Sequence, residues 1–350
     1  MNIKKLILLF AVILLSGTAV VSSAQGKYPT KVVPLPDVLT PGVLQVDTNH
    51  VYITEYATVY IYDKKDFKLR AKFGRDGEGP QEFKLSGIYS ISLTVKPDSL
   101  EIYSPEKISL YKKDGTFIKE MRVNFGMAVG WVSLLGDRFL VFDLDISTKP
   151  QHQKLTIYSP KKEKIREIAQ RESPISDKEY LMVSPLFREV IYGDRIYVVN
   201  GTEFEIDTFN FNGEKVMSLK RDYKKIKIPE DYKKKVIDLF KGKPHHRQMY
   251  REYKDKMYFP DYFPAICTFH VIDDRIYVRT NKGRGSVSIE SEFYLFTLDG
   301  KFIKELSIPI IDREFDSPYP YAIQGGHIYQ LIENEDTDEW ELHITGIDVQ

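Results

Sequence analysis

The sequence predicts an all-β protein, a six-bladed β-propeller with four-stranded antiparallel blades and one helical insertion. Three observations support this prediction. The chain repeats a unit of alternating apolar and polar residues, tight turns rich in Asp, Asn and Gly join the segments of each unit, and six such units follow one another. A regular repeat of this kind is typical of propellers and other repeat architectures. Radial repetition of four-stranded sheets also leaves only short, protected edges.

Each repeat contains two alternating strands joined by a loop, then a tight turn and a third strand, as in an antiparallel meander. A weaker apolar run before each copy supplies the fourth strand. We expect the six units to begin near residues 41, 87, 128, 184, 264 and 321. A β-sandwich is the competing architecture, but it does not explain a repeat of this period. The clearest copies are NHVYITEYATVYIYDKKDFKLRAKFG (49–74), DSLEIYSPEKISLYKKDGTFIKEMRV (98–123), DRIYVVNGTEFEIDTFNFNGEKVMSLK (194–220) and a longer one at 274–308.

The last unit, from residue 321, contains only three strand-like segments. The segment KYPTKVVPLP (27–36) also has strand character. We expect it to pair within the last blade and so join the two ends of the propeller, because an unpaired sheet edge would otherwise remain.

The first residues, MNIKKLILLFAVILLSGTAVVSSAQG, have the pattern of a secretory signal peptide. Two lysines precede an apolar run, and small residues end at Ala24. We expect cleavage after Ala24, a propeller domain over 25–350, and a mature protein in the periplasm, at the cell surface or secreted. The alternative is an uncleaved anchor, since 6–24 is nearly long enough to cross a bilayer. No later segment is apolar enough to do so, so we expect no stable membrane span after cleavage.

The charge balance excludes a strongly basic or acidic protein. The chain has 50 Lys and Arg against 50 Asp and Glu, and removal of the leader takes away two lysines, leaving 48 against 50. Nucleic acid is therefore not expected as a partner. The single cysteine, Cys267, cannot form an internal disulfide, and its apolar surroundings (AICTFHVI) predict a buried small side chain, with a functional thiol as the alternative.

The stretch KFGRDGEGPQEF (72–83) is rich in glycine and could be a phosphate-binding loop or a structural turn. A phosphate-binding loop of this kind leads into a helix N-terminus, whereas a strand-like segment follows here. The glycines permit positive φ, Pro80 fixes the turn, and Phe83 can fill the space between two blades. The sequence therefore predicts a structural role.

Residues 73–83 resemble the interblade FG..G.GPGEF motif of bacterial six-bladed β-propeller families related to NHL repeats, of the TolB-like propeller type. Gln81 stands where those families usually have glycine, and the other interblade segments lack the motif. Similarity at the level of the repeats covers roughly 27–349. Some members of these families are metal-dependent lactonases or lyases. The resemblance implies that metal ligands here would come from inner strands at the central channel, where the candidates are Glu189, His270 and His327.

Loop lengths indicate which face of the disk carries function. The turns between first and second strands and between third and fourth strands share one face and are tight, as at 193–194 and 212–213. The opposite face, which we call the long-loop face, carries the loops between second and third strands and the interblade crossings. Because loops on rigid scaffolds commonly carry function, we expect the binding surface there. The long loops are 143–153, 170–183, 224–264, 281–290, 308–320 and 333–339.

The longest insertion, 224–264, departs from strand character. Pro229 can open a helix that Gly242 ends, and Pro244 can open a second one. The candidate ligand-binding residues are Arg247, Arg251 and Tyr258, which could hold an acidic or sugar ligand. The alternative is that Arg247 and Arg251 belong to a solvated face of the insertion.

Two functional hypotheses remain open. The first is an exported propeller without catalytic activity that binds a small molecule, a glycan or a protein partner through the long-loop face. The second is a metal-dependent hydrolase or lyase of the lactonase type at the central channel. The sequence contains no Gly-x-Ser-x-Gly or His-Glu-x-x-His motif, and His245-His246 lacks a third ligand at a recognisable spacing. No metal or other cofactor is therefore expected, which favours the first hypothesis.

Overall fold

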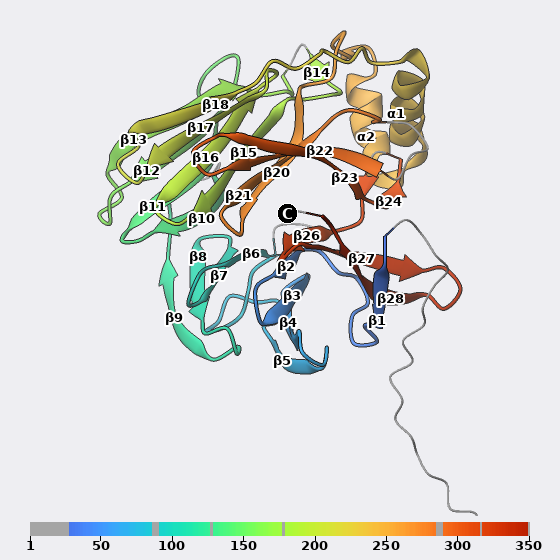
Figure 1. Cartoon of the computed structure of the whole chain (residues 1–350). Helices are drawn as coiled ribbons and strands as arrows, with labels where there is room; N and C mark the ends of the chain where they lie inside the picture. Colours follow the sequence, from blue (N-terminus) through green and yellow to red (C-terminus); the bar gives the residue numbers. More distant parts are fainter. Residues whose placement is uncertain are drawn as a thin grey trace, which may run out of the picture.

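The computed structural model describes residues 28–85, 91–126, 129–176, 179–284, 290–315 and 317–348. Six four-stranded antiparallel sheets are arranged around a central axis (Figure 1). The fold predicted from the repeats is therefore confirmed. The unit that was expected to begin near residue 87 has its first described strand at Ser92, and the others begin within three residues of the expected positions.

The strands run outward from the axis within each blade. Blade 1 contains β2 (Leu44–Val46), β3 (His50–Glu55), β4 (Thr58–Asp63) and β5 (Leu69–Phe73), and blade 2 contains β6 (Ser92–Val95), β7 (Leu100–Ser104), β8 (Lys107–Tyr111) and β9 (Phe117–Arg122). Blade 3 contains β10 (Val129–Leu135), β11 (Arg138–Asp145), β12 (His152–Tyr158) and β13 (Lys164–Glu172). Blade 4 contains β15 (Leu186–Tyr192), β16 (Arg195–Gly201), β17 (Glu205–Asn210) and β18 (Lys215–Lys220). Blade 5 contains β20 (Ile266–Ile272), β21 (Arg275–Thr280), β22 (Glu290–Thr297) and β23 (Phe302–Pro309). Blade 6 contains β26 (Tyr321–Gln324), β27 (His327–Asn334), β28 (Glu339–Gly346) and β1 (Thr30–Pro34).

Apolar residues from adjacent blades meet at each of the six seams between blades. The side chains that alternate along the middle strands are β-branched or aromatic, and they are almost completely buried. Such residues favour strands because they pack well on a pleated surface. Each seam therefore has its own apolar core, and the ring is continuous. Residues of adjacent blades that share a seam core include Ile61 and Leu100, Ile108 and Val141, Leu155 and Ile196, Ile206 and Val278, Leu295 and Ile328, and Leu342 and Ile53.

The N-terminal strand closes the ring, as expected. β1 pairs antiparallel with β28, in a register that runs from Thr30 opposite Thr345 to Pro34 opposite Glu341 (Figure 1). The backbone amide of the next residue, Leu35, donates to the carbonyl of Trp340 at 2.8 Å. Blade 6 is thus built from both ends of the described chain.

The glycine-rich stretch after β5 is a structural connection between blades 1 and 2. Its own acid, Glu82, accepts hydrogen bonds from the Gly79 amide and from the Arg75 side chain, both at 2.8 Å. Two donors that a phosphate would need are therefore occupied from within the loop, and the Gln81 amide donates to Glu120 of blade 2 at 3.1 Å. Phe83 is completely buried at the seam, as predicted.

The conformation of this stretch also explains why the related families usually have glycine at the position of Gln81. Gln81 has a φ of +58°, in the left-handed region where glycine is the least strained residue. Lys107 on β8 donates to the carbonyl of Gly79 at 3.0 Å, which fixes the loop to the next blade.

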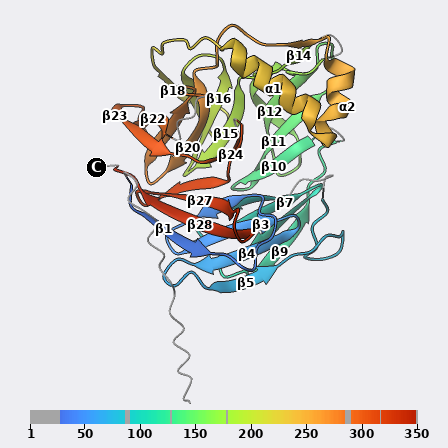
Figure 2. The ribbon, with the colours of Figure 1, turned by 90° about the vertical axis from the view of Figure 1, so that its right-hand side faces the viewer.

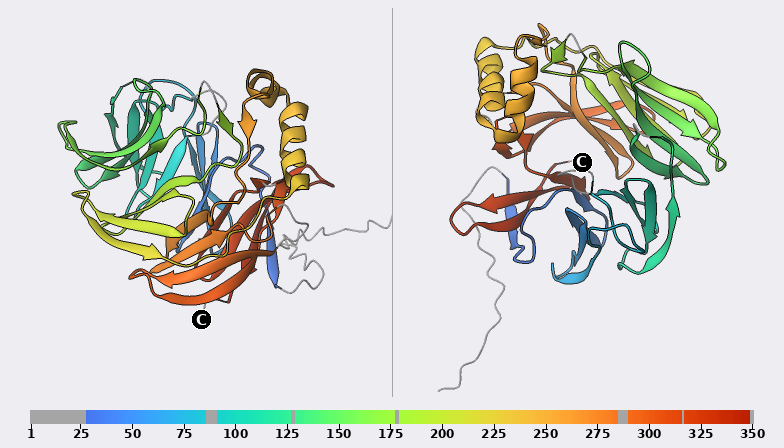
Figure 3. Two further views of the ribbon diagram at one scale, coloured as in Figure 1. Left: turned by 90° about the horizontal axis from the view of Figure 1, so that it is seen from above. Right: turned by 180° about the vertical axis from the view of Figure 1, so that it is seen from behind.

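The insertion forms two helices, α1 (Glu230–Gly242) and α2 (Pro244–Tyr253). Figures 2 and 3 show them side by side at the periphery of the disk. Tyr232 on α1 is buried, with its ring 4.9 Å from that of Phe263 and 5.3 Å from that of Phe315. The insertion thus covers the crossing between blades 5 and 6.

Two further pairs of short β-strands lie in the interblade crossings of the long-loop face. β14 (Tyr180–Leu181) runs parallel to β19 (Met257–Tyr258), so the crossing before blade 4 is bound to the helical insertion. β24 (Asp312–Glu314) pairs antiparallel with β25 (Ser317–Pro318) in the crossing before blade 6.

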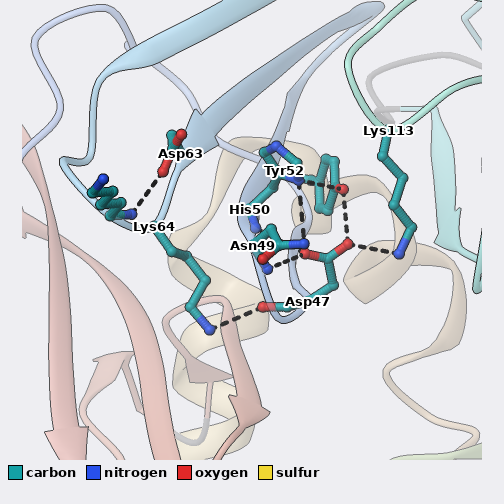
Figure 4. Close-up of polar contacts among 8 residues, drawn as sticks. Asp47, Asn49, His50, Tyr52, Asp63, Lys64 and Lys113 are labelled. Atoms are coloured by element: carbon teal, nitrogen blue, oxygen red, sulfur yellow. Dashed lines mark hydrogen bonds and ion pairs between the residues drawn. The ribbon is translucent and has the colours of Figure 1, made fainter.

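On the opposite face, Asp47 holds the β2–β3 turn together and links blade 1 to blade 2 (Figure 4). Its carboxylate accepts hydrogen bonds from the backbone amides of Asn49 and His50 at 2.8 Å and from the Tyr52 hydroxyl at 2.9 Å. Lys113, from blade 2, forms an ion pair with it at 2.8 Å. Burial alone would raise the pKa of Asp47, but the hydrogen bonds from Lys113, the two amides and Tyr52 outweigh it and lower the pKa.

We expect Asp47→Asn to destabilise the protein by roughly 1–2 kcal/mol at pH 7 and by clearly less at pH 3. The folded-state pKa lies below the usual value, so the stabilisation is present above the pKa of the unfolded chain and is lost as the pH falls. Urea unfolding at both pH values measures the difference. Asp98→Asn, at an exposed position of the corresponding turn in blade 2, is the matched control. A destabilisation that is equal at both pH values would contradict the assigned role of the charge.

Candidate functional site

The central channel contains a cavity of about 550 Å³, lined by residues of blades 1, 4, 5 and 6. Its walls include the inner strands β2, β15, β20 and β26. Three of its lining segments belong to the long-loop face: Gly42 precedes β2, Arg284 follows β21, and 318–320 ends the crossing before blade 6. The cavity therefore reaches the face on which the sequence predicted a binding surface.

Three arginines line the cavity: Arg188 on β15, Arg279 on β21 and Arg284 in the β21–β22 loop. The described lining residues include no Asp or Glu. The side chain of Arg188 is solvent-accessible and donates one hydrogen bond, at 3.0 Å, to the Thr268 hydroxyl. Within the described ranges, no carboxylate forms an ion pair with Arg188 or Arg279. The cavity is therefore a positively charged environment.

Two neutral polar side chains, His270 and Tyr321, lie next to these arginines. Their rings are 5.3 Å apart, and both line the cavity. The His270 Nε2 and the Tyr321 hydroxyl are buried atoms without a partner in hydrogen-bond geometry among the residues described, although Arg279 lies near the phenol.

Both groups are uncharged at neutral pH. Burial, together with the positive charges of Arg188 and Arg279, lowers the pKa of His270 to about 3. Burial raises the pKa of Tyr321 to about 12. The imidazole is therefore neutral and the phenol protonated, so the positive charge of the described lining comes from the three arginines. A neutral imidazole can also accept or donate a hydrogen bond, according to its tautomer.

The cavity has an asymmetric lining. The arginines, His270 and Thr268 come from blades 4 and 5. Blades 6 and 1 supply mainly apolar groups, among them the half-buried Val43, Pro318 and Pro320. A ligand that fills this space would meet positive charge on one side and apolar surface on the other.

The residues proposed from the sequence as ligand-binding lie on the insertion, away from the described cavity lining. Arg247 and Arg251 are exposed on α2, and Tyr258 on β19 is 42% exposed. The insertion approaches the cavity through Tyr232 of α1, because the guanidinium of Arg284 lies 5.8 Å from the centre of the Tyr232 ring. Arg247, Arg251 and Tyr258 therefore occupy the rim of the long-loop face, and their role in binding stays a prediction.

The three channel candidates are separated by the structure. His270 lines the cavity. Glu189 shares a side of β15 with Phe187 and Ile191, which pack in the seam between blades 3 and 4, and burial there raises its pKa to about 8. His327 is exposed at the start of β27, opposite Gln324 of the inner strand β26, and is not among the residues that line the cavity.

Cys267 also differs from its expected environment. It is half-buried and lines the cavity, whereas its apolar neighbours in the sequence predicted a buried side chain. In the part of the chain that the structure describes, no three His, Cys, Asp or Glu side chains gather closely enough to form a metal site.

The cavity arginines were not identified from the sequence because they come from different blades. A signal was nevertheless present: Arg188 and Arg279 are charged residues in otherwise largely apolar strands, near the strand ends on the long-loop face. Alternation along β15 places Arg188 on the same side as Val190, facing the cavity, and Glu189 on the other side.

No protein-family model matches the sequence, and no curated protein does so either. Among solved structures, the chain is similar to a Bacteroides fragilis protein whose name describes it as exported, with a TM-score of 0.53 and 13% identity over 91% of this chain and 95% of that one. A member of the duf4221 family from Bacteroides vulgatus has a TM-score of 0.49 and 11% identity, over 91% and 96% of the two chains. At 13% identity, the first likeness supports the fold alone. No helix in the described part is long and apolar enough to cross a membrane.

Proposed function

We propose that the protein is an exported β-propeller, without catalytic activity of its own, that binds a small molecule in the central cavity through the long-loop face. The observation that carries this proposal is the cavity of about 550 Å³, where side chains from four blades converge. Its volume lies within the usual range of small-molecule sites, and such sites combine apolar walls with a few placed polar groups. The leader pattern at residues 1–24 supports export, and the similar Bacteroides fragilis protein is itself named as exported.

Blocking the cavity tests this proposal. Val43 lines the cavity where the chain enters β2, so Val43→Trp should obstruct it. Val216→Trp adds the same bulk at an exposed position of β18 and is the matched control. In a thermal-shift screen of metabolites and sugars, compounds that stabilise the wild type should stabilise Val216→Trp equally and Val43→Trp much less. A screen without any stabilising compound, or with compounds that act equally on all three proteins, would contradict the proposal.

We further propose that the helical insertion forms the rim of this site, where Arg247, Arg251 and Tyr258 contact a ligand as it enters. Arginine can form charge-assisted hydrogen bonds with acidic groups, and tyrosine can stack on rings. Deleting the insertion is a poor test, because it would uncover the apolar residues Val183 and Phe263 beneath Tyr232.

We therefore expect Arg251→Ala to raise the Kd of a compound from the screen about tenfold or more, which corresponds to the loss of a hydrogen bond to a charged group. Lys254→Ala, an exposed cation just beyond α2, should leave the Kd unchanged. Isothermal titration calorimetry measures both. If the two variants bind alike, Arg251 belongs to a solvated face and the rim assignment fails.

A further inference from the structure

We propose that the ligand of the cavity is an amphipathic organic anion: an acidic group, such as a carboxylate, attached to an apolar ring or chain. This inference rests on the proposed function and adds the chemical class of the ligand. It is derived from three features of the described lining, namely the positive charge of Arg188 and Arg279, which no described carboxylate neutralises, the neutral polar groups of His270 and Tyr321, and the apolar wall.

The arginines provide the first argument. A guanidinium has five N–H donors in a fixed plane, well matched to an acidic group with two or three oxygens. Arg188 uses one donor on Thr268, and Arg279 has the Tyr321 phenol as its neighbour. Arg188 and Arg279 form no ion pair with a described carboxylate, so their charges are available to a ligand. A bound anion would supply the missing negative charge.

His270 and Tyr321 provide the second argument. Buried polar atoms almost always have hydrogen-bond partners, and exceptions require an explanation. Two such exceptions, the His270 Nε2 and the Tyr321 hydroxyl, belong to rings that are 5.3 Å apart in the same cavity. A small shift of the two rings toward the cavity would bring both groups within reach of the oxygen atoms of a ligand held by the arginines. A ligand that carries only positive charge would instead be repelled by the arginines, and neutral His270 and protonated Tyr321 offer no compensating negative charge.

The opposite wall provides the third argument. Blades 6 and 1 present the half-buried Val43, Pro318 and Pro320 to the same cavity. Water against this wall is replaced favourably by apolar groups, at roughly 25 cal/mol per Å² of buried apolar surface. A small inorganic anion would leave the wall in contact with water. An anion with an apolar body uses both sides of the cavity, which favours this class over free phosphate.

Two fluorescent probes that differ only in their acidic group test the inference. 8-Anilinonaphthalene-1-sulfonate carries an acidic group on an apolar ring system, and N-phenyl-1-naphthylamine has the same rings without that group. We expect Arg188→Gln/Arg279→Gln to raise the Kd of the sulfonate probe about tenfold or more and to change that of the neutral probe less than twofold. The control is Arg122→Gln/Arg195→Gln, which removes the same charge from two strand positions outside the cavity lining, Arg122 exposed and Arg195 half-buried. Circular dichroism and thermal melting establish that each variant is folded.

Val43→Trp separates this inference from the proposed function. If the cavity binds small molecules, the blocked variant should bind both probes more weakly. Weaker binding by Val43→Trp together with unchanged sulfonate binding by the cavity arginine variant would keep the cavity as a site and overturn the anionic class. Unchanged binding of both probes by Val43→Trp would overturn the cavity itself. Inorganic phosphate that displaces the sulfonate probe as well as an aromatic carboxylate does would show that the apolar body is not recognised, and would also overturn the inference.

Discussion

Phe83→Ala should lower the free energy of unfolding by about 3–5 kcal/mol, the range for removing a fully buried phenylalanine ring. Phe83 is completely buried at the seam between blades 1 and 2, where its ring lies edge-on to that of Tyr111, with 6.2 Å between the ring centres. The backbone cannot move inward easily to fill the void, because the loop is fixed by Glu82 and by Lys107 of the next blade. The cavity left by the ring should therefore persist.

Urea unfolding followed by tryptophan fluorescence measures this loss. Phe302→Ala removes the same atoms from the outermost strand of blade 5, where the side chain is 43% exposed, and should destabilise the protein much less. Equal losses in the two variants would show that Phe83 does not plug the seam in the way its burial indicates.

The fold could be predicted from the sequence because its determinants are local and repeated. Turn chemistry marks the hairpins: in the Asp114-Gly115 turn, the aspartate side chain accepts from the Thr116 amide at 2.8 Å, and Gly115 has a φ of +89°. Both features follow from residue types alone. The helical insertion could also be predicted from the sequence, since Pro229 immediately precedes α1 and Pro244 begins α2.

The site could be predicted only in part. Loop lengths identified the long-loop face, because blade topology alone decides which turns share a face. Which residues line the cavity depends on the side of the strand to which each side chain belongs, and on which blades meet around the channel. These blades are distant in the sequence: Arg188 and Tyr321 are 133 positions apart, as their numbers show. A shift of one residue along β15 replaces Arg188 by Glu189 and reverses the charge presented to the cavity. His270 was recognised because a histidine in an apolar inner strand stands out, whereas arginines on the same blades did not.

The two faces differ in whether their charged side chains are neutralised, and this difference has a physical reason. The tight-turn face contains polar clusters, such as that of Asp47, in which acids and cations neutralise each other. On the cavity side, Arg188 and Arg279 have no such partners among the described residues. A folded protein gains little from placing like charges together. The unneutralised arginines are therefore better explained by binding than by stability.

A chain that begins at Leu35 should be less stable than one that begins at Tyr28 by roughly 3–5 kcal/mol. The backbone hydrogen bonds between β1 and β28 contribute about 1 kcal/mol each. A further loss comes from Val33, which packs on the core between blades 6 and 1. Only the longer chain contains β1, and without it the edge of β28 is unpaired. Thermal melting measures the difference, and light scattering should detect association through the exposed edge.

A synthetic peptide KYPTKVVPLP (27–36) offers an internal check on the same prediction, because an extended peptide can add a strand to an open sheet edge. It should raise the melting temperature of the chain that begins at Leu35 and leave that of the longer chain unchanged, since β1 already occupies the edge. A peptide with the same composition in scrambled order removes the alternation that places Val33 on the core side and should have no effect. If the shorter chain melts like the longer one, ring closure by β1 contributes little to stability, and the seam cores alone hold blade 6 in place.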